Sequence, residues 1–163
     1  MTPFREYMKL AYDNFDNLII DVPIGTNATN NIFYSILDDL VKSEIHVIFL
    51  STMLVACHMS YEDFCNIIIT SSYTNKITGN KKDFLTFDNG STIKFASINQ
   101  KRWMNYKYDI IMLDNVNLMT SKNKLSELIP ELYKCKKVIM TNPYCEGNHP
   151  IIDLFKNKKD TYS

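Results

Sequence analysis

A chain of 163 residues with 45% hydrophobic and 12% aromatic side chains is long enough to bury a core in one domain without disulfides. Its 18 basic and 18 acidic residues give a formal net charge of zero, which argues against a surface that holds duplex DNA by charge alone. No apolar run approaches the roughly 20 residues that span a bilayer, and the first residues lack a signal-peptide core, so we expect a soluble intracellular protein with no membrane partner.

The four cysteines predict free thiols rather than disulfides. None of them forms a C-x-x-C pair, which favours reduced side chains in a chain of this class. Cys145 and His149 have a spacing found in zinc sites, but no second pair of ligands accompanies them. An ordinary loop is therefore the favoured interpretation of that segment.

Apolar spacing predicts the first elements along the chain. Phe4, Met8 and Ala11 recur at helical intervals, which predicts an amphipathic helix over residues 4–14. A short apolar run predicts a buried strand over 17–22, and apolar residues three and four apart predict a helix over 29–41. The unbroken apolar run at 46–51 is typical of a strand buried on both faces of a parallel sheet.

The pattern then changes from helical spacing to alternation. Ser60, with Asp63 three residues later, predicts the N-cap of a third helix. Residues 83–97 alternate around Asn89-Gly90, the dipeptide most typical of a β-hairpin turn. The lysine-rich residues 76–82 are predicted to form a solvated turn.

The last third of the chain returns to apolar runs that alternate with helical patterns. Strands are predicted at 108–114 and 136–143, with a helix between them that is interrupted near Pro130, and a short closing helix beginning near Pro150. Helices and strands in this order predict a three-layer α/β domain with a mostly parallel central sheet and one inserted β-hairpin. We expect a single domain over residues 1–156 and a frayed tail over 157–163.

The segment NLIIDVPIGTNATNN at 17–31 has the layout of a phosphate-binding loop. A strand, a glycine-containing loop and a helix N-terminus follow one another, and backbone N–H groups at such a helix start can hold an anion. The residues of the loop are Gly25, Thr26, Asn27, Ala28 and Thr29. An ordinary strand-to-helix turn is the alternative.

Two later strands end in polar residues that suit the same kind of site. Asp114 follows the apolar run IIML and could bind magnesium, or could simply cap the next loop. Asp109 precedes the same run, so two carboxylates bracket this strand. Thr141 and Asn142 lie at the end of the next apolar run. The simpler interpretation is that they belong to a loop that leaves this strand.

Taken in order, the loop at 22–29, the Asn-Gly-Ser hairpin, the segment YDIIMLDN and the strand ending in TNP resemble the ATPase domain of terminase large subunits, the P-loop DNA-packaging motors of tailed phages. The resemblance covers roughly residues 3–155. It implies a P-loop NTPase fold of the RecA-like type and a viral or phage origin, with ATP and magnesium as cofactors only if the domain is an active ATPase. No segment resembles the nuclease domain of that family.

The chain departs from the family pattern at the positions that carry the chemistry. Ala28 occupies the position at which the family has the lysine that neutralises the β- and γ-phosphates. Asn27 occupies the position at which the family has the last glycine of the loop. Asn115 replaces the glutamate that activates water, and an amide cannot accept that proton. The resemblance therefore implies a degenerate ATPase with no catalytic residues and no bound cofactor, in which Asp114 would hold a metal only if a nucleotide binds.

Three functional hypotheses follow, beside the possibility of an unrelated α/β protein whose Asn-Gly hairpin only imitates the family. The first is a binding or regulatory module with a protein partner in viral DNA packaging or assembly, in the cytoplasm of the host cell. The second is an active ATPase of the same family that uses Lys9, Lys42 or Arg102 in place of the missing lysine.

The third hypothesis is a domain that binds single-stranded nucleic acid. Cations and aromatic rings alternate along one segment, a mixture that suits stacking on bases, a protein interface or the packing of Trp103 in the core. The residues concerned are Lys101, Arg102, Trp103 and Tyr106, followed by Lys107 and Tyr108.

Overall fold

The computed structural model describes residues 3–21, 27–100, 106–142, 149–156 and 161–162. Its strands are β1 (Asn17–Ile20), β2 (His46–Ser51), β3 (Ile77–Lys81), β4 (Phe84–Phe87), β5 (Thr92–Ser97), β6 (Ile110–Leu113), β7 (Lys137–Thr141) and β8 (Thr161–Tyr162). Its α-helices are α1 (Pro3–Asn14), α2 (Ala28–Lys42), α3 (Leu54–Ile69), α4 (Lys122–Lys134) and α5 (Pro150–Lys156), with 3-10 turns η1 (Thr74–Lys76) and η3 (Val116–Leu118).

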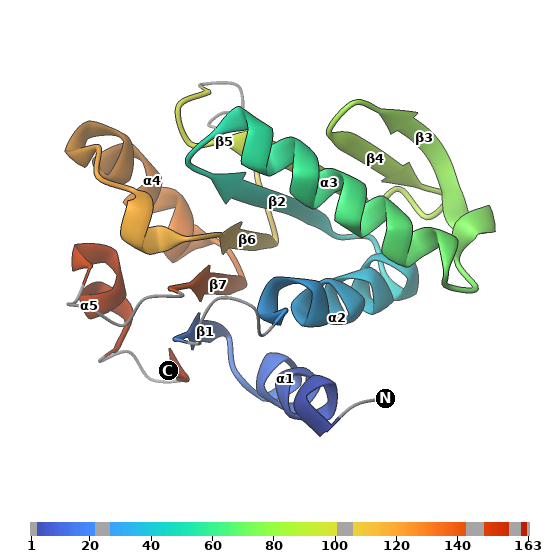
Figure 1. Cartoon of the computed structure of the whole chain (residues 1–163), viewed down its shortest axis with the longest axis horizontal. Helices are drawn as coiled ribbons and strands as arrows, with labels where there is room; N and C mark the ends of the chain where they lie inside the picture. The colour runs from blue at the N-terminus through green and yellow to red at the C-terminus, as the bar shows by residue number, and fades with distance from the viewer. Residues whose placement is uncertain (1–2, 22–26, 101–105, 143–148, 157–160, 163) are drawn as a thin grey trace.

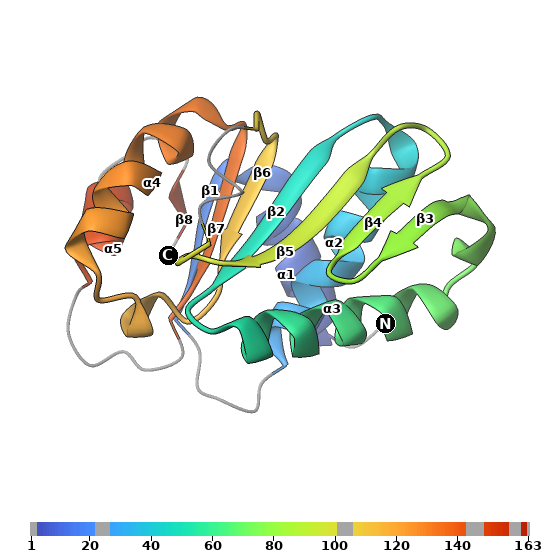
Figure 2. The ribbon, with the colours of Figure 1, turned by 90° about the horizontal axis from the view of Figure 1, so that it is seen from above.

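The strands form one mixed sheet in the order β3-β4-β5-β2-β6-β7-β1-β8. From β5 to β8 all neighbours run parallel, whereas β4 lies antiparallel to both β3 and β5. Helices α1, α2 and α3 cover one face of this sheet, and α4 and α5 cover part of the other face (Figures 1 and 2). The predicted three-layer α/β fold with an inserted hairpin is confirmed.

Alternation along the central strands gives the domain two hydrophobic cores. In β2, Val47 and Phe49 join the core beneath α1, α2 and α3, while Ile48 and Leu50 join the core beneath α4 and α5. Because both faces of these strands are buried, their sequences read as unbroken apolar runs.

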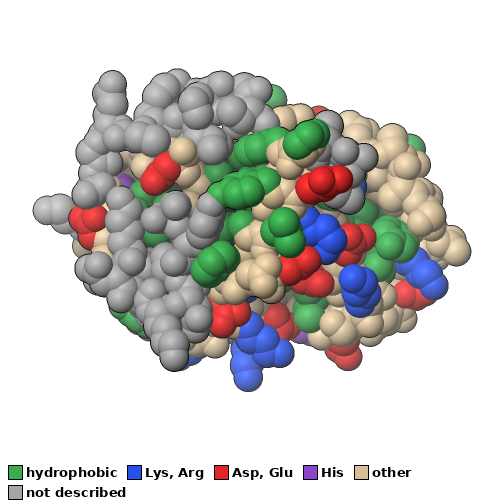
Figure 3. Space-filling view, turned by 90° about the horizontal axis from the view of Figure 1, so that it is seen from below, with side chains coloured by type: hydrophobic (Ala, Val, Ile, Leu, Met, Phe, Trp, Pro, Cys, Tyr) green, Lys and Arg blue, Asp and Glu red, His purple; other side chains and the backbone are tan. Residues whose placement is uncertain are grey.

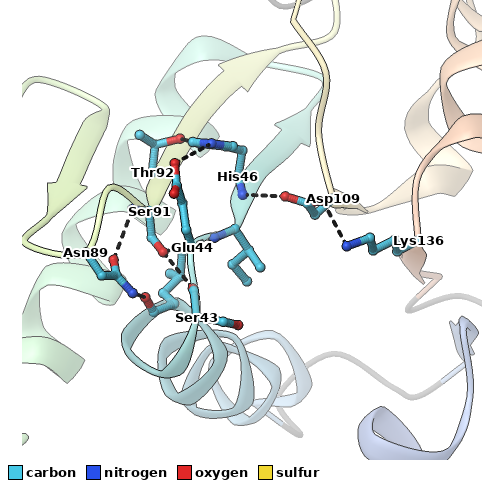
Figure 4. Close-up of polar contacts among 10 residues, drawn as sticks. Ser43, Glu44, His46, Asn89, Ser91, Thr92, Asp109 and Lys136 are labelled. Carbon is cyan, nitrogen blue, oxygen red and sulfur yellow. Dashed lines mark hydrogen bonds and ion pairs between the residues drawn. The ribbon is translucent and has the colours of Figure 1, made fainter.

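The Asn-Gly hairpin is present and is tied to the rest of the domain (Figure 4). The Asn89 side chain donates a hydrogen bond to the Leu40 carbonyl at 2.8 Å, near the end of α2. The buried Ser91 hydroxyl donates to the Ser43 carbonyl at 2.9 Å and accepts from the Ile45 backbone N–H at 3.0 Å. These contacts fix the turn against the connection between α2 and β2.

The predicted start of the third helix is wrong. Helix α3 begins at Leu54, so Ser60 lies inside the helix and is not its N-cap. Burial of Cys57, in line with Tyr61 and Phe64, extends the apolar stripe one turn further toward the N-terminus.

The predicted turn over residues 76–82 is wrong, although most of the side chains in this segment are exposed, as predicted. Most of that segment is strand β3, which pairs with β4 and places Ile77 opposite Phe87. Backbone pairing with β4 supplies the hydrogen bonds of a strand whose own side chains give a weak pattern.

Helix α4 is not interrupted at Pro130, contrary to the prediction. Pro130 lies on the exposed side of the helix, and the buried residues Leu125, Leu128 and Leu132 hold the turns before and after it against the sheet.

The surface carries both charge signs. Seen from the side on which α1 lies, acidic, basic and hydrophobic side chains are interspersed (Figure 3).

No helix in the described ranges is long and apolar enough to cross a membrane. Cys57, Cys65 and Cys135 form no disulfide within the described ranges, and Cys145 lies outside them.

Of the tail predicted to be frayed, residues 157–160 and 163 lie outside the described structure. Residues 161 and 162 form β8, which pairs in parallel with β1.

Candidate functional site

Polar side chains gather where the parallel strands end. Asp114 directly follows β6, Thr141 is the last residue of β7, and Thr29 is the second residue of α2. In open α/β sheets, ligands bind at this carboxyl edge of the strands.

The Asp114 carboxylate connects the three elements. Its Oδ1 accepts hydrogen bonds from the Thr29 hydroxyl at 3.0 Å and from the Thr141 hydroxyl at 2.9 Å. The Thr141 oxygen accepts the backbone N–H of Asn115 at 2.9 Å, and the Asn115 amide lies 3.4 Å from Asp114 Oδ2. The helix start and the acidic strand therefore meet, as the sequence predicts.

Asn27 keeps the backbone shape that a loop glycine would supply. Its φ of 60° and ψ of 30° are left-handed, a conformation that asparagine tolerates better than most residues. Its side chain makes no cap hydrogen bond, while its carbonyl accepts the Asn31 backbone N–H at 3.1 Å. The substitution at this position therefore leaves the turn into α2 in place. Gly25 and Thr26 lie outside the described residues.

Ala28 provides no charge at the start of α2. It is the first helical residue and only 8% exposed, and its methyl group can neither donate a hydrogen bond nor neutralise a phosphate. Its side chain belongs to the hydrophobic core beneath α1, α2 and α3, next in the chain to Thr29.

The structure bears differently on the three proposed replacement cations. Lys42 is the last residue of α2, about 20 Å along the helix from Ala28 at 1.5 Å per residue, so its prediction is wrong. Lys9 lies on α1 and forms an ion pair with Asp13 at 2.8 Å. Arg102 lies outside the described residues.

Burial dominates the electrostatics of Asp114. It raises the pKa of the carboxyl group, and the hydrogen bonds from Thr141 and Thr29 lower that pKa only in part. Because this carboxyl group binds a proton more tightly in the folded state than in the unfolded state, its ionisation lowers the stability of the fold. The free energy of unfolding therefore increases as the pH falls through the raised pKa of Asp114.

Asp114→Asn is therefore expected to raise the free energy of unfolding at pH 7, by about 1 kcal/mol. The amide keeps an oxygen acceptor for the two threonine hydroxyls and removes the buried charge. Urea unfolding at pH 7 and pH 5 tests this, because the gain should shrink at the lower pH. Asp13→Asn, at an exposed carboxylate on α1, is the matched control and should show no such gain; a destabilised Asp114→Asn protein at pH 7 would contradict the assignment.

The site fits magnesium only in part. The Asp114 carboxylate and the Thr29 hydroxyl are the hard oxygen donors that magnesium prefers. Within the described ranges, however, no group of three or more His, Cys, Asp or Glu residues could hold a metal ion. Phosphate oxygens and water would have to complete the coordination, so a metal here depends on a bound nucleotide.

Three further polar residues lie at the same edge; sequence reasoning named Asn142 and missed Asp21 and Ser51. Asp21 follows β1, Ser51 ends β2 and Asn142 follows β7, and each has a buried side-chain oxygen without a hydrogen-bond partner in the described structure. Unpaired buried oxygens are costly and uncommon, so they mark an edge suited to a polar ligand. The signal in the sequence is a polar residue directly after an apolar strand.

Other residues singled out in the sequence lie elsewhere. The Asp109 carboxylate accepts the His46 backbone N–H at 2.8 Å and lies 3.6 Å from the Lys136 amine, at the opposite edge of the sheet (Figure 4). Tyr106 is 62% exposed near that opposite edge. His149 contacts the Met119 carbonyl and the Ile151 backbone N–H. Lys101, Arg102 and Trp103 lie outside the described residues.

The sheet order and the site together define a P-loop NTPase fold of the RecA-like type. Strand β7 lies between β1 and β6, the helix after β1 brings Thr29 to the edge, and β6 brings Asp114. Parallel strands flanked by helices on both faces complete this architecture.

Solved structures of phage large terminases share this fold. The HK97 bacteriophage large terminase superposes with a TM-score of 0.70 at 13% identity, over 87% of this chain and 33% of that chain. The large terminase ATPase domain of Thermus phage P74-26 gives 0.68 at 7% identity, over 91% of this chain and 68% of that domain.

The Hef helicase domain of Pyrococcus furiosus gives a TM-score of 0.65 at 15% identity, over 94% of this chain and 35% of that chain. This chain therefore spans about a third of the HK97 terminase and of the Hef domain. No protein-family model and no curated protein matches the sequence. The resemblance to terminase ATPase domains is confirmed for the fold.

Proposed function

We propose that this chain is a catalytically degenerate ATPase domain of the DNA-packaging motor type, which acts as a binding or regulatory module in viral DNA packaging or assembly in the host cytoplasm. One observation carries the proposal: the Thr29–Asp114 hydrogen bond keeps the frame of a nucleotide site, while Ala28 beside it removes the cation. A fold that keeps its core and loses its catalytic groups acts through its surface.

Two substitutions affect separate steps of phosphate chemistry. Without a lysine at position 28, charge developing on the phosphates has no partner there. The Asn115 amide lies beside Asp114 and cannot take a proton from water. Losing one such group typically costs a factor of about 10² to 10⁴ in rate, so the loss of both leaves little hydrolysis.

An exposed apolar patch supports a protein partner. Met53, Leu54, Val55 and Met59 at the start of α3 are each more than half exposed. Helix α3 follows β2, so this patch lies toward the edge where the strands end. Contiguous exposed apolar residues mark interaction sites on soluble proteins. A component of the packaging motor or a related ATPase is the partner we propose.

Calorimetric titration with ATP and magnesium, together with a hydrolysis assay, tests the proposal. The wild-type chain is expected to bind no tighter than about 1 mM and to show no magnesium-dependent hydrolysis. Ala28→Lys combined with Asn115→Glu restores the two missing groups, so at least a tenfold gain in affinity and measurable turnover are expected. Ala28→Met is the matched control, since methionine provides similar length without charge.

An active ATPase with a non-standard cation is the alternative, and the intact Thr29–Asp114 contact is what favours it. Micromolar ATP affinity and hydrolysis by the wild-type chain, both lost in Asp114→Ala, would establish that alternative and overturn our proposal. The nucleic-acid hypothesis depends on a different surface, at the opposite edge of the sheet.

A further inference from the structure

A second candidate site lies away from Asp114. A groove of about 620 Å³ is lined by residues of β2, β3, β4 and β5 and by the segment that leads into β6. His46 and Thr92 are the first residues of β2 and β5, so the groove includes the edge opposite to that of Asp114. The lining residues are His46, Lys81, Lys82, Phe84, Thr92, Lys94, Tyr106, Lys107 and Tyr108.

The groove occupies a part of the sheet that α4 and α5 leave open. Ile93 and Phe95 of β5 face the core beneath α2 and α3, so Thr92 and Lys94 between them point to the other face. In Figure 1, α4 and α5 lie at the left end of the sheet, whereas β3 and β4 lie at the right end. The Thr92 hydroxyl and the His46 ring are joined at 2.8 Å, which fixes one wall of the groove (Figure 4).

Lysines give the groove a local positive charge on a chain with no net charge. Lys81, Lys82 and Lys107 are exposed and form no ion pair with any residue in the described ranges. The Lys94 amine lies 5.4 Å from the centre of the Tyr106 ring, a cation–π contact. Two acidic side chains lie beside the groove. Glu44 has an oxygen 3.8 Å from His46 Nε2, and Asp109 accepts the His46 backbone N–H at 2.8 Å while lying 3.6 Å from the Lys136 amine.

Two tyrosines complete the groove. The Tyr106 and Tyr108 rings lie 6.4 Å apart at 53°, and Tyr106 is largely exposed. The Tyr108 hydroxyl is buried and has no hydrogen-bond partner in the described structure. Burial raises the pKa of Tyr108, so its hydroxyl stays protonated and can donate to an anion. An unpaired buried hydroxyl beside lysines points to a ligand that supplies an acceptor.

We propose that this groove binds single-stranded nucleic acid, with phosphates on Lys81, Lys82 and Lys107 and a base stacked on Tyr106. An exposed aromatic ring among lysines suits a strand whose bases are unpaired. Lysine is depleted from the centres of protein interfaces, which argues against a protein ligand. Charge confined to one groove, on a neutral chain, argues against binding along a duplex.

Fluorescence anisotropy with a labelled oligothymidylate of 12 nucleotides tests the proposal. Binding is expected to weaken roughly 20- to 50-fold between 50 and 200 mM salt if three or four phosphates are neutralised. Lys82→Ala with Lys107→Ala should weaken binding and reduce the slope of log K against log salt by about 1.4. Tyr106→Ala should weaken binding about 5- to 150-fold and leave that slope unchanged, since stacking is not an ionic contact.

Lys134→Ala is the matched control, because Lys134 is an exposed lysine on α4 outside the groove. It should change neither affinity nor slope, and circular dichroism should show that every variant is folded. Equal or tighter binding of a duplex, preference for polyglutamate, or a salt slope unchanged in the lysine variant would each overturn the proposal. This test does not use the ATP measurements, so each proposal can fail without the other.

Discussion

Replacing Phe33 with alanine is expected to lower the free energy of unfolding by about 3–5 kcal/mol. The Phe33 ring on α2 is fully buried, and its centre lies 5.6, 5.2 and 6.0 Å from the rings of Phe49, Phe64 and Phe95. These partners belong to β2, α3 and β5, so truncation leaves a cavity where four elements meet. The midpoint of urea unfolding measures the loss.

Two further variants make this prediction specific. Phe33→Leu keeps most of the volume and should cost clearly less than the alanine variant. Met59→Ala, at an exposed position on α3, should change the free energy of unfolding by no more than about 0.5 kcal/mol. A loss below about 1 kcal/mol in Phe33→Ala would show that this ring is not central to the core.

Lys137→Met is expected to lower the free energy of unfolding by about 2–3 kcal/mol. The Lys137 amine at the start of β7 donates to the Phe15 carbonyl at 2.6 Å and to the Tyr12 carbonyl, and lies 4.5 Å from the centre of the Tyr12 ring. Carbonyls at the end of α1 lack helical N–H partners, and a cation there complements the helix dipole. Methionine keeps the packed stem and removes the donors.

Burial lowers the pKa of Lys137, so the charge also carries a desolvation cost, and the expected loss is net of that cost. Lys136→Met is the matched control in urea unfolding. Lys136 is the neighbouring residue, its side chain is 80% exposed, and it lies 3.6 Å from Asp109, so about 0.5 kcal/mol is expected. Equal unfolding midpoints for the two variants would contradict the capping role.

The fold was predictable where burial leaves a plain pattern. Strands β2, β6 and β7 are buried on both faces and read as continuous apolar runs. The first turn of α3 was missed because exposed Leu54, Val55 and Met59 obscure its helical spacing. Strand β3 was missed because Gly79 and Asn80 favour turns, and only pairing with β4 makes this segment extended.

The candidate site was predictable in part for a similar reason. The order of motifs along the chain indicates that Thr29 and Asp114 meet, but the contact of Thr141 with Asp114 depends on β7 lying between β1 and β6. No local segment of the sequence determines the order of the strands in the sheet. For the same reason the sequence showed Tyr106 and Lys107 as one segment and gave no sign that Lys94 of β5 would join them.

The position of β1 in the sheet has a kinetic consequence. Its neighbours are β7 and β8, so Asn17 pairs with Val138 and Leu18 pairs with Tyr162, more than a hundred residues away along the chain. Such distant pairings require long loops to close, which slows folding relative to domains held by local contacts. During synthesis the strands β2 to β5 can associate early. Strand β1 remains unpaired until β7 and β8, in the last third of the polypeptide, have been made.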